Sequence, residues 1–217
     1  MKADSKKYKY QKHGERQYEN ILAVAERLFI EQGMENVSLT DIAQECGIMR
    51  ATFYRYFQNK DDVLWQIYHR YAIEFGRQLT ESIEASNGTT YDRFKIVTDI
   101  LYAGFVANPQ SYQFLDLFND TYQAATADRD HSVYDQVFKE DEFRTGDTVR
   151  LLSENFYDGS VNPNLDSWQT AVSLIYSASY IVLGMSRMLK TMPLKYHISA
   201  QEVVRISLNA LLEGIKA

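Results

Sequence analysis

Residues 38–57 read SLTDIAQECGIMRATFYRYF, and they carry the clearest structural pattern in the chain. Ser38 is a residue type that caps helix N-termini, and the apolar spacing after it predicts a short helix over about residues 39–46. Gly47 readily adopts the positive φ that a tight turn between helices requires. A second short helix is expected over about residues 50–57. Two short helices joined this closely are typical of a helix-turn-helix, whose second helix enters the major groove of DNA.

The second helix of this pair has one apolar face and one face suited to DNA. Phe53, Tyr56 and Phe57 cluster on one side and are expected to pack in the core. Arginine side chains can donate paired hydrogen bonds to guanine or phosphate, hydroxyl groups contact phosphate oxygens, and a small alanine permits close approach. The candidate DNA-binding residues are therefore Ser38, Thr40, Arg50, Ala51, Thr52, Tyr54, Arg55 and Lys60.

A resemblance to a known family is carried by residues 17–64. The matching positions, in order and spacing, are Ile21-Leu22, Ala25, Leu28-Phe29, Gly33, Val37-Ser38, Asp41-Ile42-Ala43, Gly47-Ile48, Thr52-Phe53-Tyr54, Tyr56-Phe57, Asn59-Lys60 and Leu64. In this pattern the segment resembles the TetR family of bacterial transcriptional regulators. Met49 departs from it, because family members commonly carry a small hydroxyl residue there, and methionine cannot cap a helix. The resemblance implies a homodimeric repressor that binds near-palindromic operator DNA and is released by a small molecule.

The rest of the chain shows helical periodicity and no strand pattern, so the expected fold class is all-α. Asn59 is expected to cap a long helix that runs to about Ala85, roughly 40 Å at 1.5 Å per residue. Proline marks helix breaks at Asn108-Pro109, Asn162-Pro163 and Met192-Pro193. The expected division is a basic, disordered arm over 1–16, a three-helix DNA-binding domain over 17–64 and a larger helical ligand-binding and dimerisation domain over 65–217.

Two C-terminal helices, over about residues 166–189 and 199–215, each carry apolar residues on two faces and so must be buried on two sides. Ser199 and Glu202 form a capping-box pattern at the start of the second. The resemblance implies that these helices pair across a two-fold axis as a four-helix bundle. The expected dimer interface consists of Leu174, Ala178, Ile181, Met185, Val204, Leu208, Leu211 and Ile215.

Aromatic residues of the C-terminal part suggest a pocket for a small apolar or aromatic effector. The candidate lining residues are Phe105, Phe114, Phe118, Tyr122, Phe156, Trp168, Tyr176 and Tyr180. The alternative is a regulator whose C-terminal domain binds a protein partner, and a helical enzyme is the remote alternative. The sequence shows no coherent acid–base or nucleophile set and no metal-ligand or phosphate-loop spacing, so we expect no catalytic residues, metal or cofactor.

Charge and cysteine content indicate the compartment and the partner. The net charge is −6, but residues 1–70 carry +1 and the remainder −7, so only one end suits phosphate. Cys46 is the only cysteine, which fits a reducing cytoplasm. The apolar run over 171–189 is interrupted by serines and Arg187, which argues against a membrane span. We therefore expect a bacterial cytoplasmic protein that associates with the nucleoid when bound to DNA.

Overall fold

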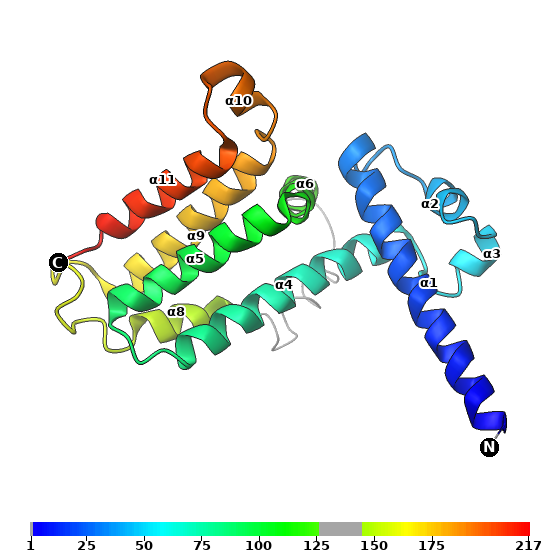
Figure 1. Cartoon of the computed structure of the whole chain (residues 1–217), viewed down its shortest axis with the longest axis horizontal. Helices are drawn as coiled ribbons and strands as arrows, with labels where there is room; N and C mark the ends of the chain where they lie inside the picture. Colours follow the sequence, from blue (N-terminus) through cyan, green and yellow to red (C-terminus); the bar gives the residue numbers. More distant parts are fainter. Residues whose placement is uncertain (1, 126–144) are drawn as a thin grey trace. The chain divides into compact units, whose positions relative to one another are not determined.

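The described chain is built from helices and loops, which confirms the all-α fold class (Figure 1). The computed structural model describes residues 2–125 and 145–217. Within these ranges the only bridge between extended segments is the isolated one that joins Val161 and Lys216. The helices are α1 (Lys2–Gln32), α2 (Leu39–Glu45), α3 (Arg50–Phe53), α4 (Lys60–Glu84), α5 (Thr90–Ala107), α6 (Pro109–Ala125), α8 (Thr145–Ser153), α9 (Ser167–Ser186), α10 (Thr191–Tyr196) and α11 (Ala200–Glu213).

The chain divides into two compact units. The first comprises Met1–Arg70 with Leu117–Ala124, and the second comprises Tyr71–Asp116 with Ala125–Ala217. Helix α4 begins in the first unit and ends in the second, and α6 contributes residues to both. The division therefore falls inside helices, whereas the sequence pattern placed a boundary after residue 64 and gave no sign that part of α6 belongs with the N-terminal helices.

Helix α1 is longer than the sequence pattern indicated. It runs unbroken from Lys2, whereas the sequence pattern predicted a disordered arm over residues 1–16. No proline and a single glycine precede the end of the helix, and polar side chains alone do not stop a helix. Gly33 ends α1 as expected, with φ +89° and its N–H donating to the Phe29 carbonyl at 3.0 Å.

The long helix α4 matches its expected bounds closely. It spans 25 residues, which corresponds to a length of about 38 Å. The Asn59 side chain accepts from the Asp62 amide at 2.8 Å, and the Asp62 carboxylate accepts from the Gln58 amide at 3.0 Å. One amide of the first turn and the amide just before the N-cap are thereby satisfied, and the helix N-terminus is held by neighbouring residues of the chain.

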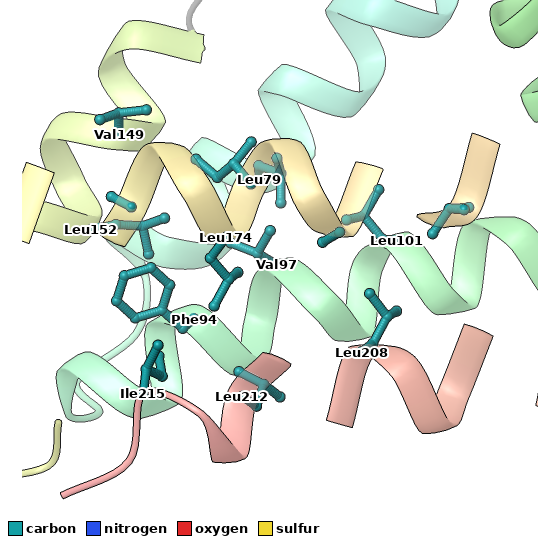
Figure 2. Packing of buried hydrophobic residues seen from close by; sticks show 14 of the residues in the cluster. Leu79, Phe94, Val97, Leu101, Val149, Leu152, Leu174, Leu208, Leu212 and Ile215 are labelled. Atoms are coloured by element: carbon teal, nitrogen blue, oxygen red, sulfur yellow. The ribbon is translucent and has the colours of Figure 1, made fainter. Parts of the chain in front are cut away.

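The core of the second unit lies between α5, α8, α9 and α11, which pack against one another (Figure 2). Leu79 reaches this core from α4. Its other labelled members come from the four helices and the C-terminal end: Phe94, Val97, Leu101, Val149, Leu152, Leu174, Leu208, Leu212 and Ile215. Fully burying one such side chain stabilises the fold by roughly 1.5–3 kcal/mol, so this cluster is the main support of the unit. In the described part of the chain, no helix combines the length and the apolar character that a bilayer span demands.

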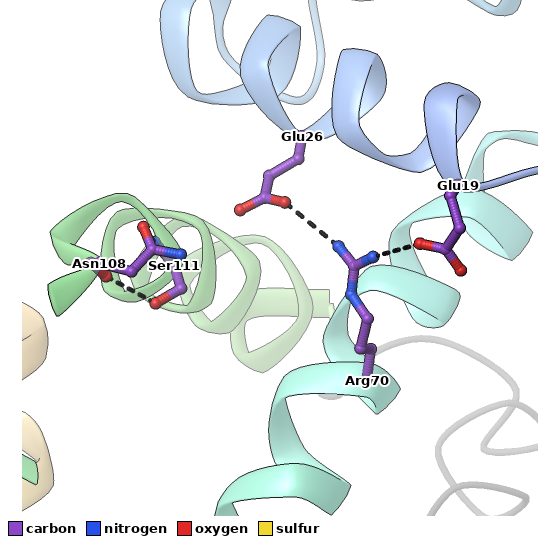
Figure 3. A network of polar contacts seen from close by, with 5 residues as sticks. All are labelled: Glu19, Glu26, Arg70, Asn108 and Ser111. Carbon is purple, nitrogen blue, oxygen red and sulfur yellow. Dashed lines mark hydrogen bonds and ion pairs between the residues drawn. The ribbon is translucent and has the colours of Figure 1, made fainter. Parts of the chain in front are cut away.

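The turn between α5 and α6 follows the expected Asn108-Pro109 break. Pro109 occupies the first position of α6, where a missing N–H leaves no hydrogen bond unmade. The Ser111 hydroxyl donates to the Asn108 carbonyl at 2.7 Å and closes the turn (Figure 3). Gly104 in the last turns of α5 lets Tyr112 of α6 approach closely, and the Tyr112 hydroxyl donates to the Leu101 carbonyl at 3.3 Å.

The C-terminal helices begin at caps that the sequence indicated. Asp166 accepts from the Gln169 amide at 2.8 Å at the start of α9. Ser199 accepts from the Glu202 amide at 3.0 Å at the start of α11. The Glu202 carboxylate forms an ion pair with Arg205 at 2.5 Å, so the reciprocal half of the expected capping box is replaced by a surface pair.

Candidate nucleic-acid interface

The first helix of the expected helix-turn-helix is fixed at both ends. Ser38 accepts from the Asp41 amide at 3.2 Å, and its own amide donates to the Asp41 carboxylate at 2.8 Å. The Ser38 hydroxyl also donates to the Asp41 carboxylate at 2.6 Å, and this bond, followed by the one from the Ser38 amide, lowers the pKa of Asp41. Gly47 then takes φ +65°, and the amides of Gly47 and Ile48 donate to carbonyls of the last turn of α2 at 3.0 Å each. This pattern ends α2 and directs the chain into α3.

Helix α3 is a single turn with one buried and one exposed edge. Phe53 is fully buried, and its ring lies 5.6 Å from that of Phe57. Arg50, Ala51 and Tyr54 are exposed on the other edge. The arrangement leaves basic, hydroxyl and small side chains facing outward from a rigid apolar anchor, as major-groove recognition requires.

The second helix is shorter than expected. It ends at Phe53, and the residues that follow form a turn in place of the helix expected to reach Phe57. Met49 occupies the N-cap position and makes no side-chain cap, so the helix lacks one of its usual stabilising contacts. Arg55 is exposed in the turn after the helix, and Thr52 is half-buried within it.

Two of the expected DNA-binding residues have clear structural roles. Ser38 caps α2, as described above, while Thr40 is exposed on its first turn. Lys60 is half-buried at the start of α4, and its Nζ donates to the Met34 carbonyl at 2.7 Å. An ammonium has three N–H donors, so one of them is committed to the protein. No sequence signal indicates this contact, because its acceptor is a backbone carbonyl 26 residues away.

Polar contacts tie α1 to α4 beneath this interface. Arg70 of α4 pairs with Glu19 at 2.9 Å and with Glu26 at 3.5 Å, both on α1 (Figure 3). The Tyr18 hydroxyl donates to the Gln66 side chain at 3.0 Å, and the Tyr18 ring stacks on that of Phe57. The two long helices are thus joined at several points along their contact, which holds the scaffold that presents α3.

A segment of α6 also belongs to this unit. The Phe118 ring stacks on Tyr68 at 4.2 Å and meets the edge of Trp65 at 4.8 Å. The Tyr122 hydroxyl donates to the Asp61 carboxylate at 2.8 Å in the first turn of α4. Residues 117–124 therefore cover the aromatic face of α4 close to the helix-turn-helix.

The eight candidate pocket residues are divided between the two compact units and differ in burial. Phe118 and Tyr122 belong to the first unit, and the other six belong to the second. Those that are fully buried in the second unit are Phe105, Phe114 and Phe156. Those that are 53% exposed are Trp168, Tyr176 and Tyr180, so they do not line an enclosed cavity within this chain. Aromatic content indicated a pocket, but helical spacing alone could not separate core positions from surface ones.

The expected dimer interface requires a correction. Five of its eight residues lie in the chain's own core, each 8% exposed or less: Leu174, Ala178, Val204, Leu208 and Ile215. These five are core positions of this chain, and they leave little surface for contact with a partner. Ile181, Met185 and Leu211 are half-buried against the same core. Both faces of α9 looked apolar in the sequence, and residues of both stripes pack inward: Leu174 and Ala178 from one, Ile175 and Val182 from the other.

Comparisons with known proteins agree with this geometry. Residues 21–67 match the model of the bacterial regulatory proteins of the tetR family. An HTH-type transcriptional regulator of Staphylococcus aureus (strain bovine RF122 / ET3-1) is 28% identical over 147 residues, which cover 64% of this chain and 79% of the relative. A second, of Staphylococcus aureus (strain MRSA252), is 25% identical over 169 residues, covering 73% and 91%.

Solved structures share the whole fold. The fatty acid degradation regulator FadR from Bacillus halodurans has a TM-score of 0.67 at 18% identity, covering 91% of this chain and 95% of its own. The SmeT–triclosan complex has a TM-score of 0.62 at 20% identity, covering 93% and 92%. The matched family and the two relatives are transcriptional regulators rather than enzymes. With a helix-turn-helix built from α2 and α3 and a match to the tetR family of bacterial regulatory proteins over residues 21–67, this chain is a DNA-binding transcriptional regulator whose N-terminal domain is similar to that family.

Proposed function

We propose that this chain is a homodimeric repressor that binds a near-palindromic operator and leaves it when a small apolar or aromatic molecule binds the second unit. The observation that carries the DNA part is the outward edge of α3, where Arg50, Ala51 and Tyr54 are exposed while Phe53 anchors the helix in the core. Such a repressor acts in the bacterial cytoplasm, where its operator lies.

The exposed face of α9 supports the homodimer. The 20 residues of α9 include no charged side chain. Yet Tyr176 on α9 is 53% exposed and Ile206 on α11 is 50% exposed. Large apolar and aromatic side chains exposed on two helices that pack together are typical of interfaces between chains. A second copy offers the same face, and a two-fold axis through it gives an isologous contact.

The helical second unit supports a small-molecule effector. Its buried aromatic residues supply apolar surface of the kind that lines ligand pockets. Among structures of the same fold, one is a complex with triclosan, and another is described as a ketosteroid transcriptional regulator, KstR2 of Mycobacterium tuberculosis. By analogy with these proteins, the effector is a small apolar or aromatic compound.

A protein effector is the second candidate, and α10 is the observation that favours it. Leu194 is 81% exposed and Tyr196 is 55% exposed on this short helix. Large apolar side chains on a protruding helix are suited to a protein contact. If Leu194→Ser weakens the response to cell extract while no small molecule changes DNA binding, this candidate replaces the first.

The test begins with selection of duplexes from a random library by the purified full-length protein. A palindromic consensus and an affinity that falls steeply with salt are expected, because phosphate contacts release counterions. Candidate effectors are then titrated with and without the selected operator. Linkage requires that an effector which weakens operator binding is itself bound more weakly by the same factor when operator is present. Equal affinities in both titrations exclude that compound as an inducer, and failure to enrich any sequence refutes the operator proposal.

A further inference from the structure

Arg50 and Tyr54 form a local pair on the exposed edge of α3. The Tyr54 hydroxyl oxygen accepts from Arg50 Nη2 at 2.9 Å and from Nε at 3.3 Å. The guanidinium carbon lies 5.5 Å from the centre of the Tyr54 ring. One phenol oxygen therefore engages the whole Nε–Nη2 edge of the guanidinium, which fixes the direction in which the rest of the group faces.

This contact leaves a defined set of donors. A guanidinium carries five N–H groups in a planar fork, and the Nε–Nη2 edge uses two of them. The Nη1–Nη2 end, with its two parallel N–H groups, remains for another partner. Such a parallel pair matches the O6 and N7 acceptors of guanine in the major groove. It also matches two oxygens of a phosphate, so the test must separate these two targets.

The backbone makes the pair rigid. The Tyr54 amide donates to the Arg50 carbonyl at 3.2 Å, so the two residues face each other across one helical turn. Phe53, between them in the chain, is fully buried, and its ring meets that of Tyr54 edge-on at 6.2 Å. The phenol is thus supported from the core, and holding the arginine in advance reduces the entropy lost on binding.

Arg50 also differs from Arg27 and Arg70 in the charge of its hydrogen-bond partner. Arg27 pairs with two glutamates, and so does Arg70. In the described part of the chain, the hydrogen-bond partner of Arg50 is a neutral phenol, so its charge stays available to an electron-rich partner.

We infer that Tyr54 is a positioning residue for base recognition, whose hydroxyl aims the Nη1–Nη2 end of Arg50 at a guanine in each operator half-site. The inference rests on the proposed operator binding. It adds which base is recognised, a guanine, and which residue pair recognises it, Arg50 and Tyr54. It assigns Tyr54 to sequence discrimination, whereas the residue pattern alone suggested a phosphate contact that supports every sequence equally.

The experiment uses full-length protein and the duplex enriched from a random library. Guanines of the half-site are replaced one at a time by 7-deazaguanine, which lacks the N7 acceptor, and affinities are measured by fluorescence anisotropy. The variants are Tyr54→Phe, which removes only the hydroxyl, and Arg50→Lys, which keeps the charge but not the fork. Tyr196→Phe, which removes a hydroxyl from α10 in the second unit, is the matched control.

At one guanine, wild type is expected to lose roughly 5- to 150-fold in affinity, the range for one paired base contact. This loss should shrink by about 2- to 12-fold in Tyr54→Phe, the factor of one net hydrogen bond, and at least as much in Arg50→Lys, which lacks the planar fork. Binding to a scrambled duplex should stay unchanged in Tyr54→Phe, and Tyr196→Phe should match wild type throughout.

Two results would overturn the inference while leaving operator binding intact. In the first, no 7-deazaguanine affects wild type. In the second, Tyr54→Phe weakens specific and scrambled duplexes equally and lowers the log–log salt slope by about 1, which identifies Tyr54 as a phosphate contact. If wild type enriches no sequence at all, the proposed operator binding fails as well, and that outcome is visible before any variant is made.

Discussion

Gly104→Ala tests the packing of α5 on α6, and the structure predicts its effect on the free energy of unfolding. A Cβ at Gly104 would lie 2.5 Å from the Tyr112 hydroxyl oxygen, closer than real contacts allow. Tyr112 is 9% exposed, and its ring packs edge-on against Phe105 at 5.9 Å, so it has little room to move. Burial also raises the pKa of Tyr112 to about 12, which keeps the hydroxyl protonated at ordinary pH.

Two effects of opposite sign determine the result. Replacing glycine by alanine inside a helix stabilises it by ~1 kcal/mol, whereas overpacking a buried contact costs ~1–3 kcal/mol. Gly104→Ala should therefore lower the free energy of unfolding by ~0–2 kcal/mol. In a Tyr112→Phe background the clashing oxygen is gone, and the next ring atom lies at 3.4 Å, an ordinary contact distance. There the same substitution should stabilise by ~1 kcal/mol.

The measurement is urea unfolding of the four proteins of this double-mutant cycle, followed by circular dichroism. Gly76→Ala on α4 is the matched control, because nothing lies within 4 Å of its would-be Cβ, and it should stabilise by ~0.5–1 kcal/mol. A coupling energy of ~1–3 kcal/mol between Gly104 and Tyr112 is expected. If Gly104→Ala stabilises the wild type as much as Gly76→Ala does, the packing described for α5 and α6 is wrong.

Three other changes have defined outcomes. Partial burial raises the pKa of Asp158, but hydrogen bonds from a neighbouring serine and from backbone amides outweigh it and lower the pKa to about 2. The stability that this carboxylate provides above about pH 4 should therefore be lost as the pH falls toward 2. In Asp158→Ala, the free energy of unfolding measured in urea should depend less on pH over that interval, and an unchanged dependence contradicts this. Tyr176→Glu should convert dimers into monomers in sedimentation velocity, while Leu194→Glu on α10 should not; dimers in both would place the interface elsewhere. Met49→Thr should raise the free energy of unfolding by ~0.5–1 kcal/mol in urea by supplying the missing cap of α3, and no gain would show that the cap is already satisfied.

Local signals in the sequence predicted much of the fold. Ser38 and Gly47 mark the ends of α2 through contacts within a few residues, so their roles are readable without the tertiary structure. Asn59 and Asp62 likewise mark the start of α4. The exposed edge of α3 also follows from residue spacing, since Phe53 fixes which side is buried.

Non-local contacts explain what the sequence could not predict. Both stripes of α9 are apolar, and only the packing of α5 and α11 decides that Leu174 and Ala178 face inward. Lys60 looked free to contact phosphate because the Met34 carbonyl carries no side-chain signal. The end of α3 at Phe53 was missed because the residues after it are equally compatible with a further helical turn.

The participation of residues 117–124 in the first unit has a practical consequence for hybrid regulators. Exchanging DNA-binding domains between relatives usually relies on a cut in the linear sequence, such as one after Arg70. A hybrid cut there would place foreign residues against the Trp65 ring, now covered by Phe118 and Tyr122 at centroid distances of 4.8 and 5.2 Å. Transferring the DNA-binding unit of this protein intact therefore requires moving two stretches of chain together, Met1–Arg70 and the α6 segment Leu117–Ala124.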